Sequence, residues 1–411
     1  MTFSLSTLPL EDCLEALIDY RGKTPEKTSS GIPLITAKII KGGRIETPTE
    51  FIAFDNYASW MRRGLPQAGD VVLTVEAPLG EVAQLGSEKV ALAQRVVTLR
   101  GKAGLLDNTY LLYLLQTEEM QDQLRARSTG TTVFGIKQSE LRKVPVALPP
   151  IDAQIAAAST LKTIDDRITL LCETNATLEA IAESLFKSWF VDFEPVHAKK
   201  LGQVPAGMDE ITAALFPDSF EDSEFGELPK GWKVGKVEDI LELAYGKALK
   251  STDRVDGAVP VYGSGGITGY HNQPLVTGPS IIVGRKGTVG SLYWEDKAFF
   301  PIDTVFYVRS ILPLTFCYYL LQTLGLEKMN TDGAVPGLNR NNVYRLEVIV
   351  PPTSVLMQFD NLISAFRARI FSNNEMIEYL STLREALLPR LISGQIQIAA
   401  LEVEIKPGKT R

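Results

Sequence analysis

Histidine and cysteine are scarce in this chain, with two His and three Cys among 411 residues. Cys13, Cys172 and Cys317 lie far apart and form no C-x-x-C pair, and His197 and His271 are equally isolated. Such a scattered set cannot supply the closely spaced ligands of a zinc site, so we expect no metal. An odd, dispersed set of thiols is typical of a reduced protein, which favours the cytoplasm.

The motifs of the common catalytic families are also missing. The sequence contains no G-x-x-x-x-G-K-[ST], no G-x-S-x-G and no H-E-x-x-H. It also lacks the Asp-Pro-Pro-Tyr and Asn-Pro-Pro-Tyr motifs of amino-methyltransferases. The glycines of YGSGGITG, 262–269, are spaced G-x-G-x-x-x-G, which favours a turn over a dinucleotide loop. We therefore assign no catalytic residue and no cofactor, and an enzyme with unfamiliar motifs stays an alternative.

No apolar stretch approaches 18 residues, and the first residues, MTFSLSTLPL, lack a basic segment, so we expect neither a membrane span nor a signal peptide. The net charge is −7, which by itself argues against a nucleic-acid partner. Acidic and basic residues are balanced in 1–150 and in 226–352, however, and the acidic excess lies in 151–225. A local basic face on either balanced region is therefore compatible with the composition.

The chain repeats itself. TTVFGIKQSELRKVPVALPPID, 131–152, aligns without a gap with GAVPGLNRNNVYRLEVIVPPTS, 333–354, at a shift of 202 residues. Each copy ends in a Pro pair that disfavours helix before it, and Asp152 and Thr353 or Ser354 are the expected helix N-caps. Gly394 is the expected end of the second helix.

A heptad pattern follows each Pro pair, and it predicts two helices of about 35–40 residues. So narrow an apolar seam is stable only against a partner, and the other copy is the obvious one. Asn175 and Asn373 occupy seam positions, either as devices that set the register or as locally wet helix ends. The seam residues are Leu161, Ile164, Ile168, Leu171, Asn175, Leu178, Ala182, Leu185 and Trp189 in the first copy and Ile363, Phe366, Ile370, Asn373, Ile377, Leu380, Arg384, Leu387 and Leu391 in the second.

Weaker matches extend the repeat towards the start of each copy. LYLLQT, 112–117, resembles YYLLQT, 318–323, and both predict helix; 71–85 resembles 280–294, and both predict a strand, a loop and a strand. The predicted fold is therefore α+β, with two homologous globules joined by an antiparallel two-helix coiled coil and an internal pseudo-twofold repeat. The expected boundaries are 1–150 for globule one, 151–193 for helix one, 194–229 for a linker, 230–352 for globule two, 353–394 for helix two and 395–411 for a tail.

The globules differ most where loops are expected, and these loops carry polar groups that suit phosphate or base-edge contacts. Arg and Lys can bind guanine, and Asn and Gln can bind adenine. These cations could equally meet an acidic protein partner. The candidate DNA-contacting residues are Arg21, Lys23, Lys38, Lys41, Arg62, Arg63, Lys137 and Gln138 in globule one and Tyr262, Ser264, His271, Asn272, Arg285, Lys286, Asn339, Arg340 and Asn341 in globule two.

Over essentially its whole length the chain resembles the specificity subunits of type I restriction-modification systems. The segments that carry the resemblance are LFKSWFVDFEPV, 185–196, LLPRLISGQI, 387–396, LPKGWKVGKVEDI, 228–240, and the loop sequences DYRGKTP, GIPLITAKII and YGSGGITGYHNQPLVTGPSIIVGRKGTVGS. The resemblance implies two target-recognition domains that each read one half of a split DNA site in the major groove. It also implies conserved spacer helices between the domains.

The resemblance further implies a subunit without a catalytic centre. Its partners would be double-stranded DNA, two methyltransferase (modification) subunits and ATP-driven restriction subunits. The junctions beyond the two seams, SWFVDF and RLISG, are the expected partner contacts, through Trp189, Phe190, Phe193, Arg390 and Leu391. The repeat then has a reason, because a bipartite site needs two readers. The alternative from another class is a protein–protein scaffold with two homologous modules on a coiled-coil strut and no role on DNA.

Overall fold

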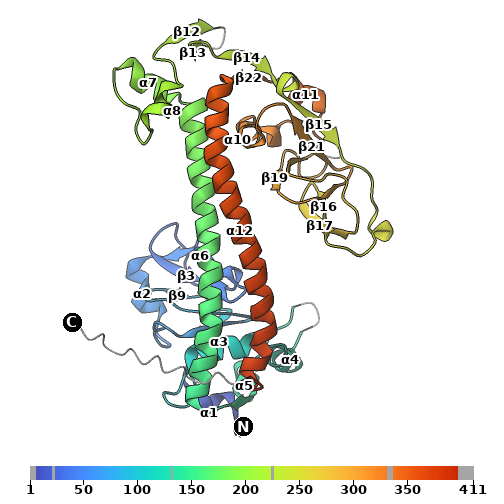
Figure 1. The fold of residues 1–411 in the computed structure, drawn as a ribbon. Helices are drawn as coiled ribbons and strands as arrows, with labels where there is room; N and C mark the ends of the chain where they lie inside the picture. The colour runs from blue at the N-terminus through green and yellow to red at the C-terminus, as the bar shows by residue number, and fades with distance from the viewer. Residues whose placement is uncertain (1–5, 21–23, 131–132, 224–225, 331–336, 397–411) are drawn as a thin grey trace, which may run out of the picture. The chain divides into compact units, whose positions relative to one another are not determined.

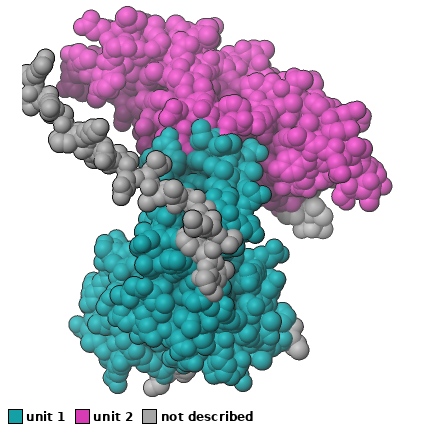
Figure 2. Space-filling view, turned by 60° about the horizontal axis from the view of Figure 1, so that its bottom comes forward, with its two compact units in different colours: residues 1–170, 376–411 teal, residues 171–375 magenta. Residues whose placement is uncertain are grey.

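The computed structural model describes residues 6–20, 24–130, 133–223, 226–330 and 337–396. They belong to two compact units, unit 1 with residues 1–170 and 376–411 and unit 2 with residues 171–375 (Figure 2). Each unit combines one globule with part of each of two 40-residue helices, α6 (Ile151–Phe190) and α12 (Thr353–Ile392) (Figure 1).

Globule one of unit 1 mixes short strands with short helices. Its helices are α1 (Leu10–Cys13), the 3-10 turn η1 (Ala37–Ile39), α2 (Phe54–Trp60), α3 (Asn108–Gln116), α4 (Glu118–Ala126) and α5 (Gln138–Arg142). Its strands are β1 (Ser6–Pro9), β2 (Leu14–Asp19), β3 (Ile32–Ile35), β4 (Ile40–Lys41), β5 (Arg44–Ile45), β6 (Phe51–Ile52), β7 (Val71–Val75), β8 (Leu79–Gln84), β9 (Ala91–Leu92), β10 (Val96–Gly101) and β11 (Pro145–Leu148).

Unit 2 contains a second globule of the same kind. Its helices are α7 (Glu194–Lys200), α8 (Glu210–Ala214), α9 (Val237–Ile240), η2 (Ser251–Asp253), α10 (Leu314–Thr323), η3 (Leu326–Lys328) and α11 (Arg340–Tyr344). Its strands are β12 (Phe220–Ser223), β13 (Gly226–Pro229), β14 (Lys233–Lys236), β15 (Leu241–Tyr245), β16 (Val259–Gly263), β17 (Gly266–His271), β18 (Ser280–Gly284), β19 (Leu292–Glu295), β20 (Phe300–Pro301), β21 (Val305–Ser310) and β22 (Glu347–Val350).

The two globules share one topology. Each has a four-stranded antiparallel sheet, ordered β2-β10-β7-β8 in one and β15-β21-β18-β19 in the other. Each adds a parallel pair with one antiparallel neighbour, β9-β3-β6 and β20-β16-β17, and an isolated pair, β1-β11 and β14-β22. In both sheets one inner strand, β7 or β18, is a continuous buried run, as expected for strands that are covered on both faces. The predicted α+β repeat is confirmed.

Helices α6 and α12 pack antiparallel within each unit. In unit 1 Arg384 contacts Asp165, and in unit 2 Arg367 contacts Glu179, so that higher numbers on one helix meet lower numbers on the other. None of the predicted seam residues is exposed. The apolar residues near the two ends of the helix pair, such as Leu161 and Ile363, also join the main core of their unit. The predicted coiled coil is therefore confirmed, and mutual burial explains why two such long helices form.

The seam asparagines bind each other. The Asn175 side chain donates to Asn374 Oδ1 at 2.8 Å and accepts from Asn373 Nδ2 at 2.7 Å, and Asn373 is buried. Of the two interpretations of these residues, the structure supports the paired one over a wet helix end. A polar pair inside an apolar seam favours the one register in which both amides are satisfied.

The helix ends differ slightly from expectation. The N-cap prediction for Asp152 and Thr353 or Ser354 is wrong, because the helices begin at Ile151 and Thr353. The carbonyl groups of Pro150 and Pro352 accept the first helical hydrogen bonds, a role that does not require the N–H group that proline lacks. Helix α12 ends at Ile392, and Gly394 follows with a φ of 74°, as predicted for a helix terminator.

The segment 194–229, expected as a linker, carries α7, α8 and the β12-β13 hairpin. Val196, Phe216 and Leu228 are buried in the main core of unit 2. These apolar residues are spaced without a helical or strand period, so the sequence pattern does not reveal that they pack. The connection from α6 to globule two is thus folded against the core rather than extended.

Candidate nucleic-acid interface

Five of the predicted contact residues of globule two gather at one place. We call the group of Tyr245, Arg285, Lys286, Asn339, Arg340 and Asn341 the arginine patch; Tyr245 is its only member that the sequence did not suggest. The Arg285 carbonyl accepts a hydrogen bond from Leu338 N at 2.8 Å, and Lys286 forms a β-bridge with Gly337. These backbone bonds bring the loop after β18 against the start of α11, although the two are more than 50 residues apart in sequence.

The loop after β18 owes its shape to glycines. Gly287 and Gly290 have φ angles of 87° and 73°, a region that other residues rarely adopt. A Cβ on Gly290 would also lie 2.4 Å from the backbone nitrogen of Glu327. The loop therefore turns tightly, and it leaves Lys286 exposed and Arg285 half-buried.

Aromatic rings support both arginines. The guanidinium of Arg285 lies 4.9 Å from the ring centre of Tyr245, and that of Arg340 lies 4.7 Å from the same ring. Arg285 also donates to the Asp303 carbonyl at 3.0 Å. Within the described chain no carboxylate lies within ion-pair distance of Arg285, Lys286 or Arg340, so these cations are available to an external anion.

Asn339 caps the N-terminus of helix α11, and Asn341 lies in its first turn. The side-chain oxygen of Asn339 accepts a hydrogen bond from Asn341 N at 2.9 Å. Its side-chain amide nitrogen makes no hydrogen bond within the described residues, and both asparagines are exposed. They can therefore donate to a ligand that contacts the arginines.

The other predicted residues of globule two have different positions. Ser264 lies in the β16-β17 turn, and its hydroxyl oxygen accepts from Thr288 N at 3.4 Å, beside the arginine patch. Tyr262 is buried and donates to Glu295 at 2.8 Å, and burial together with this carboxylate raises the pKa of Tyr262. His271 and Asn272 lie at the far end of the hairpin, about 15–20 Å along the strand from its turn. His271 Nδ1 accepts a hydrogen bond from Val255 N.

Globule one has a topologically equivalent tip. Ile136 N donates to the Val75 carbonyl at 3.0 Å, just as Leu338 N donates to that of Arg285, and Glu76 bridges Gly135 as Lys286 bridges Gly337. The predicted Lys137 and Gln138 therefore correspond to Asn339 and Arg340. Lys137 is exposed and Gln138 is half-buried.

Sequence reasoning missed one cation of this tip, Arg95. It lies 4.0 Å from Glu76, and both side chains are about half exposed. Its carbonyl accepts from Val75 N at 3.0 Å, as the Thr304 carbonyl accepts from Arg285 N. A lone arginine before an apolar strand gives no sign in the sequence that it contributes to a binding site. Only the pairing of the strands places Arg95 at the tip.

The remaining basic residues of globule one are dispersed. Lys41 pairs with Glu46 at 3.0 Å, and Arg63 donates to the Asp19 carbonyl at 3.0 Å, at the end of β2. Lys38 and Arg62 are exposed, and Arg62 lines a polar hollow of about 500 Å³ beside Trp60. Arg21 and Lys23 lie outside the described residues.

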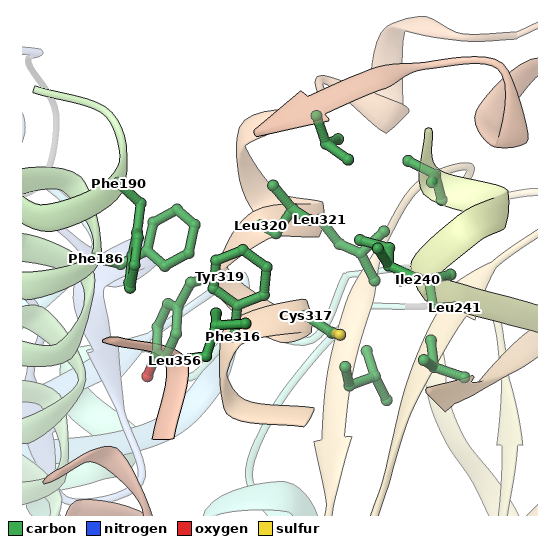
Figure 3. Close-up of a cluster of buried hydrophobic side chains, with 14 of the residues drawn as sticks. Phe186, Phe190, Ile240, Leu241, Phe316, Cys317, Tyr319, Leu320, Leu321 and Leu356 are labelled. Carbon is green, nitrogen blue, oxygen red and sulfur yellow. The ribbon is translucent and has the colours of Figure 1, made fainter. Parts of the chain in front are cut away.

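The predicted partner-contact residues are mostly buried. Phe186 and Phe190 project from α6 towards Phe316 of α10 (Figure 3), and Trp189 packs edge-to-face on Phe216 at 5.1 Å. Leu391 is also buried, Phe193 is half-buried, and Arg390 is exposed. The aromatic side chains at the end of the first seam thus build the core of unit 2, and of the five predicted contact residues Arg390 alone is exposed.

The described residues contain no group of three or more His, Cys, Asp and Glu side chains placed to hold a metal ion. None of the described helices is long and apolar enough to cross a membrane.

Comparison with known proteins gives one consistent result. The chain is 26% identical over 365 residues to the type I restriction enzyme MjaIX specificity subunit of Methanocaldococcus jannaschii, with 81% of this chain and 79% of that protein covered. It is 24% identical over 381 residues to the HindI specificity subunit of Haemophilus influenzae, with 75% and 82% covered. The crystal structure of the S subunit from M. genitalium shares the fold, with a TM-score of 0.61, 19% identity and 95% and 96% of the two chains covered.

The family model described as the type I restriction modification DNA specificity domain matches twice, at residues 21–180 and 229–383. Each match begins in one globule and ends in the long helix that follows it. Since the two matches together span more than half of the chain, the protein belongs to the family of type I restriction-modification specificity subunits and carries two copies of its DNA specificity domain.

Proposed function

We propose that this chain is the DNA-reading subunit of a type I restriction-modification complex. Globule one and globule two each read one half of a bipartite sequence, and the α6–α12 pair serves as the spacer between the two readers. The chain itself catalyses nothing. It positions the subunits that methylate and cleave the DNA.

The observation that carries this proposal is one topology used twice with different side chains at the same tip. Arg285 and Lys286 follow β18, whereas the equivalent positions hold Val75, the last residue of β7, and Glu76. A scaffold that is repeated for structural reasons alone has no cause to vary so strongly at one corresponding loop. Two readers of different half-sites require that variation, because each base pair presents its own set of donors and acceptors in the major groove.

The internal repeat also supports two modification subunits as partners. Two similar surfaces on one chain can bind two copies of the same protein in equivalent ways. Because Trp189, Phe190 and Leu391 are buried, we place the contacts at these junctions on exposed neighbours such as Val191 and Arg390. The restriction subunits are proposed partners of the assembled complex.

The test combines the purified chain with its cognate modification subunits, S-adenosylmethionine and a library of random duplexes. We expect methylation at one bipartite motif, with two defined half-sites separated by a gap without base preference. An Arg285→Ala variant should weaken or relax the half-site read by globule two and leave the other unchanged. The matched control is Arg309→Ala, an exposed arginine of β21 that pairs with Glu242.

Methylation without sequence preference in the wild-type complex would refute the proposal and favour the protein–protein scaffold. Equal damage to both half-sites by Arg285→Ala would show that the loop after β18 does not serve one reader alone. Methylation by the purified chain without partners would revive the enzyme alternative.

A further inference from the structure

Tyr245 is the shared support of the two arginines in the arginine patch. Its ring packs edge-to-face on Phe306, with a centroid distance of 5.0 Å, and Phe306 is fully buried. Tyr245 itself is 49% exposed, with one guanidinium at 4.9 Å and another at 4.7 Å. A ring anchored in the core thus holds two like charges near each other at the surface, and this arrangement restricts both side chains before any ligand binds.

The two guanidinium groups keep different donors free. Arg285 uses Nη1 for the Asp303 carbonyl at 3.0 Å, while its Nε and Nη2 make no hydrogen bond within the described chain. Arg340 uses Nη1 for the Leu243 carbonyl at 3.4 Å, and its Nε is buried without a partner. Arg285 therefore retains a two-donor edge of Nε and Nη2, whereas Arg340 presents chiefly one arm, through Nη2.

Among the residues that the structure describes, this arrangement occurs in globule two alone. In the sheet register Tyr245 pairs with Phe306, which pairs with Val283, and the equivalent series in globule one is Asp19, Val97 and Leu73. Asp19 thus stands where globule two has Tyr245. Together with the tip equivalences above, Asp19, Val75 and Gln138 replace Tyr245, Arg285 and Arg340. If the fold required a ring between two arginines, both globules would contain one. The Tyr245 arrangement of globule two is therefore best explained by the DNA half-site that this globule binds.

We propose that Arg285, held in place by Tyr245, reads one guanine in the half-site of globule two, and that Arg340 contacts a neighbouring phosphate. The inference rests on the proposed function and adds to it a base and a division of roles. Guanine presents O6 and N7 side by side in the major groove, and the free two-donor edge of Arg285 matches that pair. A single arm suits one phosphate oxygen. Tyr245 is a positioning residue that acts through Arg285.

The experiment maps the methylated motif of the complete complex on a random duplex library for each variant. Arg285→Lys keeps the charge at the tip but loses the planar fork, so preference for one guanine should fall roughly ten- to a hundred-fold. The rest of the motif should stay as in wild type. Tyr245→Phe should keep the motif, because the ring remains, and Tyr245→Leu should relax the same guanine.

Arg340→Ala gives the contrasting result. Loss of a phosphate contact should reduce methylation of all sequences alike and leave the motif unchanged. The slope of log affinity against log salt for the complex should become shallower by about one. These readouts separate positioning from general damage, because a destabilised globule would not lose preference at a single base pair.

An unchanged guanine preference in Arg285→Lys, or a relaxed base pair that contains no guanine, would overturn this inference while the bipartite motif of the wild type stands. A relaxed base pair in Arg340→Ala would overturn the division of roles. A wild-type complex without any bipartite motif would instead overturn the proposed function on which the inference rests.

Discussion

Arg367 of α12 donates to Glu179 of α6 at 2.8 Å within unit 2. The guanidinium is also bound to the Tyr319 hydroxyl at 2.9 Å and lies 4.6 Å from the ring centre of Tyr318 and 4.9 Å from that of Trp294. Unit 1 repeats the motif with Arg384 and Asp165 at 2.6 Å, beside the hydroxyl of Tyr113. In both units α12 supplies the arginine and α6 the acid. Both ion pairs therefore favour the pairing of α6 with α12 over the pairing of either helix with a second copy of itself.

We expect Glu179→Gln to destabilise unit 2 by about 2–4 kcal/mol, because it leaves the buried Arg367 charge without its carboxylate. Urea denaturation followed by tryptophan fluorescence checks this, since Trp189, Trp232 and Trp294 all lie in unit 2. Glu173→Gln, at an exposed position of the same helix, is the control and should change stability by less than about 0.5 kcal/mol. Equal unfolding midpoints for the two variants would contradict the expectation.

Asn175→Ala should cost about 1–3 kcal/mol, because the buried amide of Asn373 then loses its acceptor in the seam. The same denaturation measurement applies. Thr177→Ala, an exposed residue two positions further on α6, is the matched control. A loss no larger than that of the control would indicate that water replaces the missing partner.

Stability should decline in alkaline solution. Burial raises the pKa of Tyr110, Tyr113 and Tyr319, and it raises the pKa of the Cys317 thiol to about 11. Because the folded pKa lies above the unfolded value, these groups stabilise the fold fully below about pH 9 and progressively less above it, as the unfolded chain releases protons first.

Melting temperatures between pH 8 and 10.5 test this expectation. They should fall as the pH rises, and Tyr110→Phe, which removes one such hydroxyl, should show a smaller fall. A melting temperature that stays constant over this range would be evidence against it.

The junction residues should separate into structural and partner-contact roles. Trp189→Ala should cost about 3–5 kcal/mol of stability, because the ring fills the core of unit 2. Arg390→Ala should leave stability within about 0.5 kcal/mol and, on the proposed function, weaken binding of the modification subunit as measured by calorimetry. Arg142→Ala, a half-exposed arginine of unit 1 that pairs with Glu11, is the control. Unchanged binding by Arg390→Ala would remove Arg390 from the partner surface.

The tip of globule one should read its own half-site. On the proposed function, Arg95→Ala and Lys137→Ala should each reduce affinity for cognate duplex without altering the half-site of globule two. The measurement is methylation of duplexes mutated in one half at a time. Arg125→Ala is the control, because that arginine is exposed on α4 and pairs with Asp122. Loss of preference in the half-site of globule two would show that the two readers are not independent.

Much of the fold follows from local periodicity. The heptad seams, the Pro pairs and the gapless repeat predict two long helices, and the matches at 71–85 and 280–294 predict the strand pairs that the structure contains. These signals are readable because a helix or a hairpin depends on residues close together in sequence. The same signals place Arg285 and Lys286 on a loop, whereas Arg340, also expected on a loop, is the first residue of α11. They miss Val196, Phe216 and Leu228, whose burial follows no period.

The roles of Tyr245 and Arg95, by contrast, were decided only by the tertiary structure. Tyr245 meets Arg285 and Arg340 because β15, the loop after β18 and the start of α11 converge through strand pairing across long sequence separations. Arg367 likewise owes its burial to the antiparallel register of α6 and α12. Periodicity specifies which face of an element is apolar. The neighbours of a polar side chain depend instead on where elements far apart in sequence come together, and no local sequence pattern encodes that meeting.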